Sequence, residues 1–334
     1  MKYMADNVNY FNKSSNSIWI TWESQVRNKT LSKEIQAALY QLESKKARLR
    51  RYIDLTILTF NIIRKSPANV VVVQNPSIIL ALVANIFCRL TFKKLAVDAH
   101  NGGLFPIDGK YWVLNRLAEI IVKITPLTIV SNEELKKYVE GKGGKSIVVP
   151  DPLPALTPSQ KNKSTELYKA VFVCTWARDE PYAEVIEAAK KLPENIKLYI
   201  TGNHKGRANI SLEGYPNVVL TGYISDTDYV DLLDSADVTI DLTTRDNCLV
   251  CGAYESVALE KPMILSNKKA LRSYFNKGAL YTENNAEDIA ENIVKSQSLN
   301  EELAEEVKQM KLEKTYEWKN IKKDLFLALD IKCS

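Results

Sequence analysis

Short apolar segments alternate along the chain with longer amphipathic ones, and this alternation limits the possible folds more than any other feature. Candidate strands of the first half lie at residues 17–21, 69–74, 94–99, 127–132 and 146–150. Those of the second half lie at residues 169–175, 197–202, 217–222, 238–243 and 262–266. Between them, segments such as 184–192 and 228–236 carry apolar residues three and four positions apart, as amphipathic helices do. The pattern predicts parallel sheets with helices on both faces.

A segment rich in proline and polar residues, DPLPALTPSQKNKSTE, begins at Asp151 and separates the two series of strands. Such a segment is typical of an interdomain linker. The 334 residues are also enough for two domains. We therefore predict one Rossmann-like domain over residues 1–158 and a second over residues 165–310. The last part, residues 311–334, ends a long helical stretch that we expect to pack back on the first domain.

The composition argues against several classes of protein. A hydrophobic content of 46% and a charged content of 25% are those of a soluble globular protein. The formal charge of +5 does not indicate nucleic-acid binding. The most apolar window, residues 69–92, is interrupted by polar residues and a proline, whereas a membrane span needs about 20 mostly apolar residues in a row. Five cysteines without a signal-peptide pattern lead us to expect reduced thiols in a cytoplasmic protein.

Two short motifs suggest functions that their context does not favour. Cys248 and Cys251 form a single C-x-x-C pair, but structural zinc takes four ligands, and both histidines lie far away in the sequence. We expect packing thiols and no bound metal. The segment GKGGKS, residues 141–146, lacks the first glycine of a phosphate-binding loop and precedes a strand. We predict a turn there. No G-x-G-x-x-G motif follows a strand, which argues against a dinucleotide-dependent oxidoreductase.

The segment DAHNGGLFP follows a predicted strand, at the edge where parallel α/β sheets bind ligands. Asn101, Gly102 and Gly103 would let the backbone approach a ligand closely. His100 has two interpretations at this point. It is either a structural histidine with internal partners or a side chain that contacts a ligand at the end of the strand.

A basic segment, residues 43–65, carries seven basic and two acidic residues. Leu49, Ile53, Ile57 and Phe60 fall on one helical stripe within it. One interpretation is a helix that covers the sheet and exposes a solvated basic face. The other is a surface helix over residues 45–65 that contacts an anionic membrane.

Four segments, in order, carry a family resemblance. Residues 128–154, 171–203 and 217–243 are similar to the end of an acceptor domain, the first strand–loop–helix–strand of a donor domain, and the segment before a catalytic loop. The run AYESVALEKPMILSNKKALRSYF is similar to a donor-site segment that begins E-A-x-A-x-G-x-P-V-I. Together they resemble the GT-B glycosyltransferases, especially the retaining family 4 type (group 1). Glu255 stands where that family has the glutamate that holds the ribose of a sugar nucleotide.

The resemblance implies an α/β fold of the GT-B type, with two Rossmann-like domains whose parallel sheets face a central cleft and a C-terminal helix that crosses back to the first domain. It implies a hexosyltransferase that moves a sugar from a UDP- or GDP-linked donor to a glycan or polyprenyl-linked acceptor. Retention of configuration, no metal and no other cofactor are implied as well. Such enzymes commonly build bacterial surface polysaccharide, so we expect a cytoplasmic protein, peripheral on the inner face of the membrane if residues 45–65 contact lipid.

The resemblance and the strand ends together give the candidate site residues. We expect a catalytic role for His100, Asp246 and Asn247. The candidate donor-binding residues are Glu255, Arg178, Lys205, Arg245, Gly252, Tyr254 and Thr175. The candidate acceptor-side residues are Trp22, Glu23, Arg27, Asn101, Gly102 and Gly103.

Two departures from the family pattern leave other functions open. Asn247 stands where the family usually has a glutamate, and Thr175 and Glu180 align with its phosphate-binding arginine and lysine. Arg178 or Lys205 would then replace those cations. One alternative is an inactive GT-B protein that serves as partner or scaffold for another transferase. A nucleotide-sugar epimerase is the other, although such enzymes usually place carboxylates and histidines in the cleft and this chain has two histidines.

Overall fold

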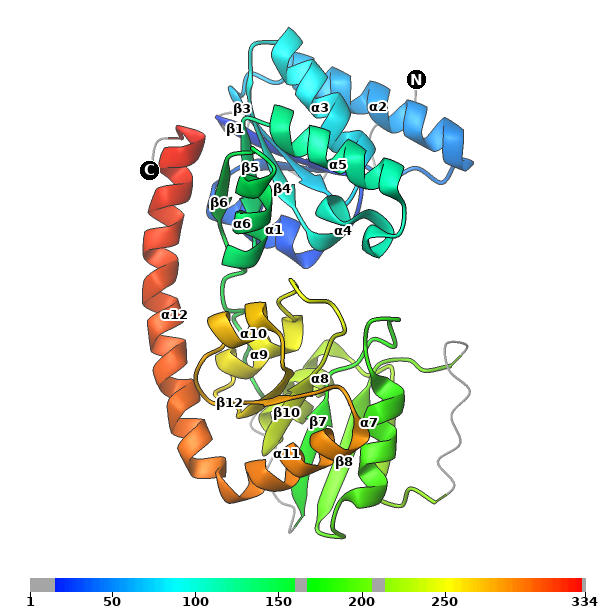
Figure 1. Cartoon of the computed structure of the whole chain (residues 1–334). Coiled ribbons are helices and arrows are strands. Elements are labelled where there is room, and N and C mark those ends of the chain that lie inside the picture. Colours follow the sequence, from blue (N-terminus) through cyan, green and yellow to red (C-terminus); the bar gives the residue numbers. More distant parts are fainter. Residues whose placement is uncertain (1–15, 160–166, 206–213, 332–334) are drawn as a thin grey trace. The chain divides into compact units, whose positions relative to one another are not determined.

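The computed structural model describes residues 16–159, 167–205 and 214–331, which form two compact units. The first unit comprises Met1–Asp151 and Trp318–Ser334, and the second comprises Pro152–Glu317. The long helix α12 (Asn300–Leu329) begins in the second unit and ends in the first (Figure 1). The division after Asp151 coincides with the start of the proline-rich segment.

The first unit contains a six-stranded parallel sheet with the order β2-β1-β3-β4-β5-β6. Its strands are β1 (Ser17–Thr21), β2 (Ala38–Gln41), β3 (Val70–Asn75), β4 (Lys94–Ala99), β5 (Leu127–Val130) and β6 (Ser146–Val148). Its helices are α1 (Val26–Glu34), α2 (Arg48–Lys65), α3 (Ile78–Leu90), α4 (Asn101–Leu104), η1 (Pro106–Gly109), α5 (Trp112–Ile124) and α6 (Glu133–Gly141).

Alternate residues of these strands face opposite layers of helices, as the pleat of a strand requires. One face, which includes Ile18 and Val71, packs on apolar side chains of α2, α3 and α5. The opposite face, which includes Trp19 and Val72, packs on α1 and on the last turns of α12. Helix α3 contacts both α2 and α5, so these three form one layer (Figure 1).

Helix α2 resolves part of the question about the basic segment. Leu55 and Ile63 on this helix are 2% and 0% exposed and face the sheet. Leu49, Ile53 and Ile57 are 75%, 52% and 54% exposed. Helix α2 therefore covers the sheet, as one of the two interpretations states, and it does so through a second apolar stripe; contact with a membrane stays a prediction.

The second unit repeats the architecture with a six-stranded sheet of order β12-β11-β10-β7-β8-β9, again parallel. Its strands are β7 (Tyr168–Phe172), β8 (Ile196–Thr201), β9 (Val218–Gly222), β10 (Val238–Asp241), β11 (Met263–Ser266) and β12 (Ala279–Thr282). Its helices, besides the first part of α12, are α7 (Tyr182–Ala188), η2 (Ala189–Lys191), α8 (Asp226–Asp234), α9 (Cys251–Ala258), α10 (Lys269–Tyr274) and α11 (Ala286–Ser298).

The core of the second unit also has two layers. Phe172 and Ile240 lie on the face that packs on α7 and α11. Val171 and Met263 lie on the other, against α8, α9, α10 and α12. The predicted α/β fold with two parallel sheets is confirmed. No helix in the described ranges is long and apolar enough to cross a membrane.

Candidate functional site

The first unit gathers polar side chains at the carboxyl ends of β1, β3 and β4, which are neighbours in its sheet. Thr21 ends β1, Gln74 lies near the end of β3, and Asp98 pairs with Gln74 in the register of β4. His100 follows directly after β4. Parallel strands end at one edge of a sheet, so residues far apart in sequence meet there.

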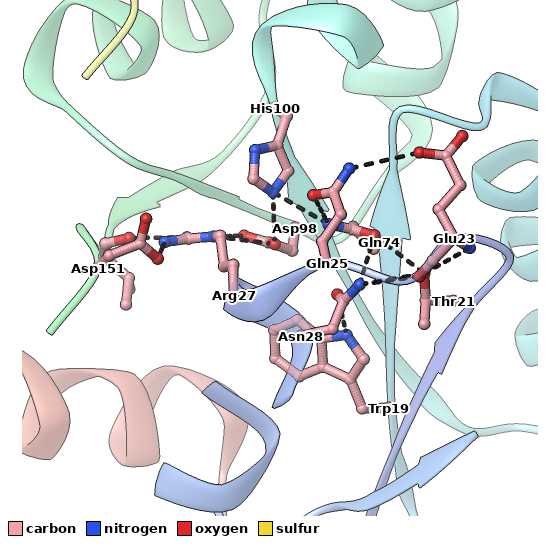
Figure 2. Close-up of polar contacts among 11 residues, drawn as sticks. Trp19, Thr21, Glu23, Gln25, Arg27, Asn28, Gln74, Asp98, His100 and Asp151 are labelled. Atoms are coloured by element: carbon pink, nitrogen blue, oxygen red, sulfur yellow. Dashed lines mark hydrogen bonds and ion pairs between the residues drawn. The ribbon is translucent and has the colours of Figure 1, made fainter. Parts of the chain in front are cut away.

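A buried ion pair forms the base of this cluster. The guanidinium of Arg27 donates to Asp98 with Nη2–Oδ1 at 2.8 Å, to Asp151 with Nη1–Oδ1 at 2.7 Å, and to the carbonyl oxygen of Val149 at 2.8 Å (Figure 2). Arg27 is 6% exposed and Asp98 is 0% exposed.

Electrostatics keep both members of this pair charged. Burial alone would disfavour each charge, but the attraction of Asp98 and then Asp151 outweighs it and raises the pKa of Arg27. Burial likewise opposes the charge of Asp98, yet the charge of Arg27 and a hydrogen bond from His100 hold the pKa of Asp98 well below its usual range. Arg27 was expected on the acceptor side. Its guanidinium binds the carboxylates of Asp98 and Asp151 and so positions them, while a contact of Arg27 with an acceptor stays a prediction.

His100 lies on top of this pair with its Nε2 turned toward the protein. Nε2 is 3.3 Å from Asp98 Oδ2 and 3.2 Å from Gln74 Nε2. The orientation of the Gln74 amide group can be traced from Trp19, because an indole N–H can only donate a hydrogen bond. Trp19 Nε1 donates to Asn28 Oδ1 at 2.8 Å, which turns the amide nitrogen of Asn28 toward Gln74. Asn28 Nδ2 then donates to Gln74 Oε1 at 2.6 Å, and Gln74 Nε2 donates to Gln25 Oε1 at 2.5 Å (Figure 2). Because the Nε2–H of His100 donates to Asp98, the amide nitrogen of Gln74 lies beside the ring without donating to it.

The histidine side chain is 31% exposed, so it is both held and accessible. A ring whose Nε2 is fixed by internal partners presents its other edge outward. The internal partners agree with the structural interpretation of His100, and its exposure agrees with the functional one. The two interpretations are therefore compatible.

The remaining acceptor-side residues divide between a pocket and the packing of the strand ends. Trp22, Glu23 and Gly102 line a pocket of about 530 Å³ in the first unit. Gly103 packs on β3, because a Cβ atom there would lie 2.5 Å from the carbonyl oxygen of Asn75. Asn101 Oδ1 is buried and has no hydrogen-bond partner among the described residues.

In the second unit, Glu255 is held by a tyrosine from a neighbouring helix. Tyr229 Oη, on α8, donates to Glu255 Oε2, on α9, at 2.5 Å. Burial raises the pKa of Glu255, while the bond from Tyr229 lowers it. The carboxylate is only partly buried, so it keeps access to a ligand while its orientation is fixed.

A carboxylate of the protein itself accepts a hydrogen bond at the N-terminus of α9. Asp241, at the end of β10, accepts from the amide of Gly252 at 2.7 Å. A Cβ atom at Gly252 would lie 2.6 Å from the same Asp241 oxygen. The amide of Gly252 is thus used by Asp241 and its lack of a side chain serves packing, while the expected contact of Gly252 with the donor stays a prediction. Burial, and then the charge of Glu255, raises the pKa of Asp241 well above its usual value, although the Gly252 amide acts in the opposite direction.

The loop after β7 is also organised around a carboxylate. Glu180 accepts from the backbone amides of Thr175 and Ala177, each at 2.9 Å, and from Thr175 Oγ1 at 2.7 Å. Thr175 and Glu180 are the residues that align with the cations of the family. Here they bind each other, so the loop has a fixed shape but a different charge.

The other donor-side candidates lie on or near exposed loops. Arg178 and Lys205 are exposed, as expected of replacement cations. Arg245 is half-exposed, with its Nη1 3.2 Å from Asp179 Oδ2. Asp246 is exposed and pairs with Lys268 at 2.8 Å, and Asn247 next to it is partly buried.

Two further expectations concern the core of the second unit. Tyr254 is 4% exposed, and its ring meets Phe275 edge-on at 5.1 Å between centroids. The ring therefore packs in the core, and the expected donor contact of Tyr254 stays a prediction. Cys248 is partly buried and Cys251 is exposed, and neither forms a disulfide. Among the described residues, no three His, Cys, Asp or Glu side chains are grouped so as to hold a metal ion.

Several residues that shape these sites were not predicted from the sequence: Gln74, Asp98, Glu180, Tyr229 and Asp241. A signal existed for two of them. Asp98 and Asp241 are acidic residues within apolar strand segments, where a charge needs partners. No signal in the sequence points to Tyr229, because it contacts Glu255 only through the packing of α8 and α9.

The comparisons with known proteins concern the fold and the second unit of the chain. Residues 157–312 match the family model described as "Glycosyl transferases group 1". None of the curated proteins matches the chain.

Solved structures with the same architecture have low sequence identity. HepE (Alr3699) of Anabaena, in complex with UDP, is 11% identical with a TM-score of 0.72, covering 94% of this chain and 99% of that one. Sucrose-phosphate synthase of Thermosynechococcus elongatus is 12% identical with a TM-score of 0.67, covering 86% and 82%. A putative UDP-N-acetylglucosamine 2-epimerase of Listeria monocytogenes is 10% identical with a TM-score of 0.55, covering 88% and 91%.

These likenesses establish the fold, and the family model matches a range that contains most of the second unit. The match begins at residue 157 and ends at residue 312, so it contains β7 to β12 and the Tyr229–Glu255 pair. The chain therefore has the GT-B fold, and its residues 157–312 match the family model of the glycosyl transferases group 1.

Proposed function

We propose that this protein transfers a sugar from a nucleotide sugar, UDP-linked in the first instance, to a hydroxyl group of a glycan or lipid-linked acceptor. The observation that carries the proposal is the Tyr229–Glu255 pair within the family match. A carboxylate can accept hydrogen bonds from both hydroxyls of a ribose, and Tyr229 fixes its direction. HepE was solved in complex with UDP, which supports UDP as the first nucleotide to test on this chain.

The reaction breaks the bond between the anomeric carbon of the sugar and the diphosphate oxygen, which keeps the electron pair. The acceptor hydroxyl forms the new bond to that carbon, and its proton passes to the departing diphosphate oxygen or to solvent. Stabilising the departing diphosphate requires positive charge or amide donors. We assign this role to Arg178 and Lys205, since both are exposed cations. Retention of configuration and independence from metal are parts of the same proposal.

We assign the sugar and the acceptor to the first unit. His100 is accessible and oriented by Gln74 and Asp98, as a group that contacts a reacting sugar must be. The pocket lined by Trp22 and Glu23 combines aromatic and carboxylate groups, a surface suited to a sugar acceptor. A cytoplasmic place at the inner face of a membrane, reached through residues 45–65, and a part in surface-polysaccharide synthesis complete the proposal.

The test is to incubate the protein with a panel of UDP- and GDP-sugars and to measure both the nucleotide released and the thermal shift of the protein. A transferase binds one donor and releases its nucleotide diphosphate, faster when the acceptor is present. Glu180, a carboxylate where the family resemblance implies a cation, favours an inactive scaffold, which would bind a nucleotide or none and release nothing. An epimerase would convert the sugar without stoichiometric release of nucleotide.

A further inference from the structure

A pocket of about 530 Å³ lies between the strand ends of the first unit and its helices α2, α3 and α5. Its lining residues lie between Trp22 and Leu117, so it belongs to the first unit alone. Its volume falls in the range of small-molecule sites, about 300–1,000 Å³. An arginine, two glutamates and two aromatic rings are among the residues that line it, which indicates a polar ligand.

Arg51 on α2 is the cation of this pocket, and its hydrogen-bonding capacity is not used up by the protein. Its Nε is buried and has no hydrogen-bond partner among the described residues. The centre of its guanidinium lies 5.2 Å from the ring of Tyr52, which also lines the pocket. A buried N–H of a charged group needs an acceptor, and a ligand in the pocket can supply one.

The stability of helix α2 does not explain why an arginine is at this position. Helix α2 begins at Arg48, so Arg51 lies in its first turn, and that turn contains no acidic residue. The sequence RLRR places three arginines there. The N-terminus of a helix carries a partial positive charge, so cations in the first turn are unfavourable for the helix. The same arrangement makes the adjoining pocket attractive to an anion.

A second helix begins at the same pocket. Ser77, Ile78 and Ile79 form the start of α3, and all three line the pocket. Ser77 Oγ accepts from the amide of Leu80, and the first turn of α3 contains no acidic residue. The amides of Ile78 and Ile79 precede the first hydrogen bond within the helix, so the helix itself offers them no acceptor. Such amides, together with the helix dipole, favour an anionic ligand.

The two carboxylates of the pocket are on its exposed side. Glu23 and Glu43 are both exposed, whereas Arg51 is partly buried. An exposed carboxylate stays hydrated and can accept hydrogen bonds from the hydroxyls of a ligand. Trp22 and Tyr52, whose rings lie 6.1 Å apart, add an aromatic wall. The pocket therefore combines an interior suited to an anion with an outer part suited to hydroxyl groups.

The donors of the interior fit a phosphate better than a carboxylate. A guanidinium donates through a planar fork that takes two oxygens of an anion. The amides at the start of α3 come from a different element and can donate to a third oxygen. A phosphate monoester has three free oxygens, and a carboxylate has two. A phosphate can therefore use both sets of donors at once.

We propose that this pocket binds a phosphate ester, with the phosphate at Arg51 and the first amides of α3, and with the hydroxyls of a sugar at Glu23 and Glu43. As an acceptor site it rests on the proposed transferase function, which it deepens. The acceptor is then a sugar phosphate, or a sugar linked to a lipid through phosphate. The binding of the phosphate ester itself does not depend on that function.

The test is isothermal titration of the whole protein, saturated with UDP so that a donor site is filled, with glucose 6-phosphate, glucose and glucuronate. Glucose 6-phosphate should bind about 10-fold more tightly than either of the others, or better. Farnesyl phosphate, a lipid phosphate without a sugar, distinguishes the two sources of the phosphate. Tighter binding than that of glucose 6-phosphate supports a lipid-linked acceptor, and weaker binding supports a sugar phosphate.

Two variants, each with a matched control, locate the site. Arg51→Gln should weaken the binding of glucose 6-phosphate by about 10- to 150-fold. Arg50→Gln removes the same charge from the same turn, at an exposed residue that does not line the pocket, and should bind as the parent does. Ile78→Pro removes one amide at a helix position that suits proline, and should weaken binding by about 3- to 10-fold. Ile78→Val keeps the amide and should not.

The proposal is overturned if Arg51→Gln binds glucose 6-phosphate as the parent does, if Arg50→Gln loses as much affinity as Arg51→Gln, or if glucuronate binds as tightly as glucose 6-phosphate. If Arg51→Gln does not fold, the comparison of Ile78→Pro with Ile78→Val decides the question.

UDP affinity should stay at the parental value in all four variants, which separates this site from the proposed function. Binding of glucose 6-phosphate that depends on Arg51, without transfer to any acceptor, would support the site and contradict the transferase. Transfer with unchanged affinity for phosphate esters in Arg51→Gln would contradict the site and leave the transferase intact.

Discussion

Tyr229 and Glu255 are 26 positions apart in the chain, and the phenol of the first donates to the carboxylate of the second at 2.5 Å. This bond opposes burial, which by itself raises the pKa of Glu255. If the ionised carboxylate accepts the ribose hydroxyls, UDP affinity falls as the pH drops through the pKa of Glu255. The variant Tyr229→Phe removes the bond, so that pKa rises further and the loss of affinity begins at a higher pH.

Isothermal titration with UDP over the acidic to neutral range measures both profiles. The variant Tyr215→Phe, which removes a phenol that bonds to Glu187, is the matched control and should follow the parent. If the pH profiles of UDP affinity for Tyr229→Phe and the parent were superimposable, Tyr229 would play no part in nucleotide binding.

The buried pair of Arg27 and Asp98 makes a prediction about stability. The pKa of Asp98 is held low, so its contribution to stability is present above its unfolded value, about 3.9, and is lost as the pH falls through the folded value. Arg27→Met leaves Asp98 buried without its main partner, which should cost about 3–5 kcal/mol of unfolding free energy near neutral pH.

In the Arg27→Met variant the shift of the Asp98 pKa is reversed, because burial without the arginine raises that pKa above its unfolded value. Protonation then stabilises the variant, and the difference from the parent should narrow as the pH falls toward the acidic range. Urea unfolding at neutral and mildly acidic pH measures the difference. Adding Asp98→Asn to Arg27→Met should recover part of the loss at neutral pH. This account would be contradicted if the difference in unfolding free energy between Arg27→Met and the parent stayed constant at every pH and the double variant recovered none of the lost stability.

The cysteine pair has a simpler prediction. Cys248 and Cys251 have only a packing role in our account, so the double change to alanine should leave UDP affinity and turnover close to the parent. Metal analysis of the purified parent should find no stoichiometric zinc. Loss of activity in the double variant, or one zinc per chain, would show that the pair is part of the site.

Much of the fold could be predicted because the apolar strands are nearly continuous. All ten predicted strands are present in the sheets, whereas β2 and β12 were missed. Both are four-residue edge strands, ALYQ and ALYT, in which a polar residue follows a short apolar stretch. The orientation of α2 was undecided because the helix has two apolar stripes, and the sequence does not show which one meets the sheet.

The sites were less predictable than the fold because their key contacts join distant segments. Arg27 was noticed, but its partner Asp98 lies 71 positions away and is known only from the pairing of strands. Gly252 and Tyr254 were assigned to the donor from their place beside Glu255. Alternate sides of α9 face different surroundings, so neighbours of a site residue in sequence are turned into the core.

The central claim is a division of labour, with Glu255 binding the nucleotide and His100 acting on the sugar. The measurement that tests it most directly is UDP affinity beside the transfer rate at saturating donor, for Glu255→Gln and His100→Ala. Glu255→Gln should weaken UDP binding by about 1.5–3 kcal/mol, roughly 10- to 150-fold, and change the saturated rate little. His100→Ala should lower the saturated rate by about 10-fold or more and leave UDP affinity unchanged. If Glu255→Gln binds UDP as tightly as the parent, the second unit does not hold the donor through this residue and the account is wrong.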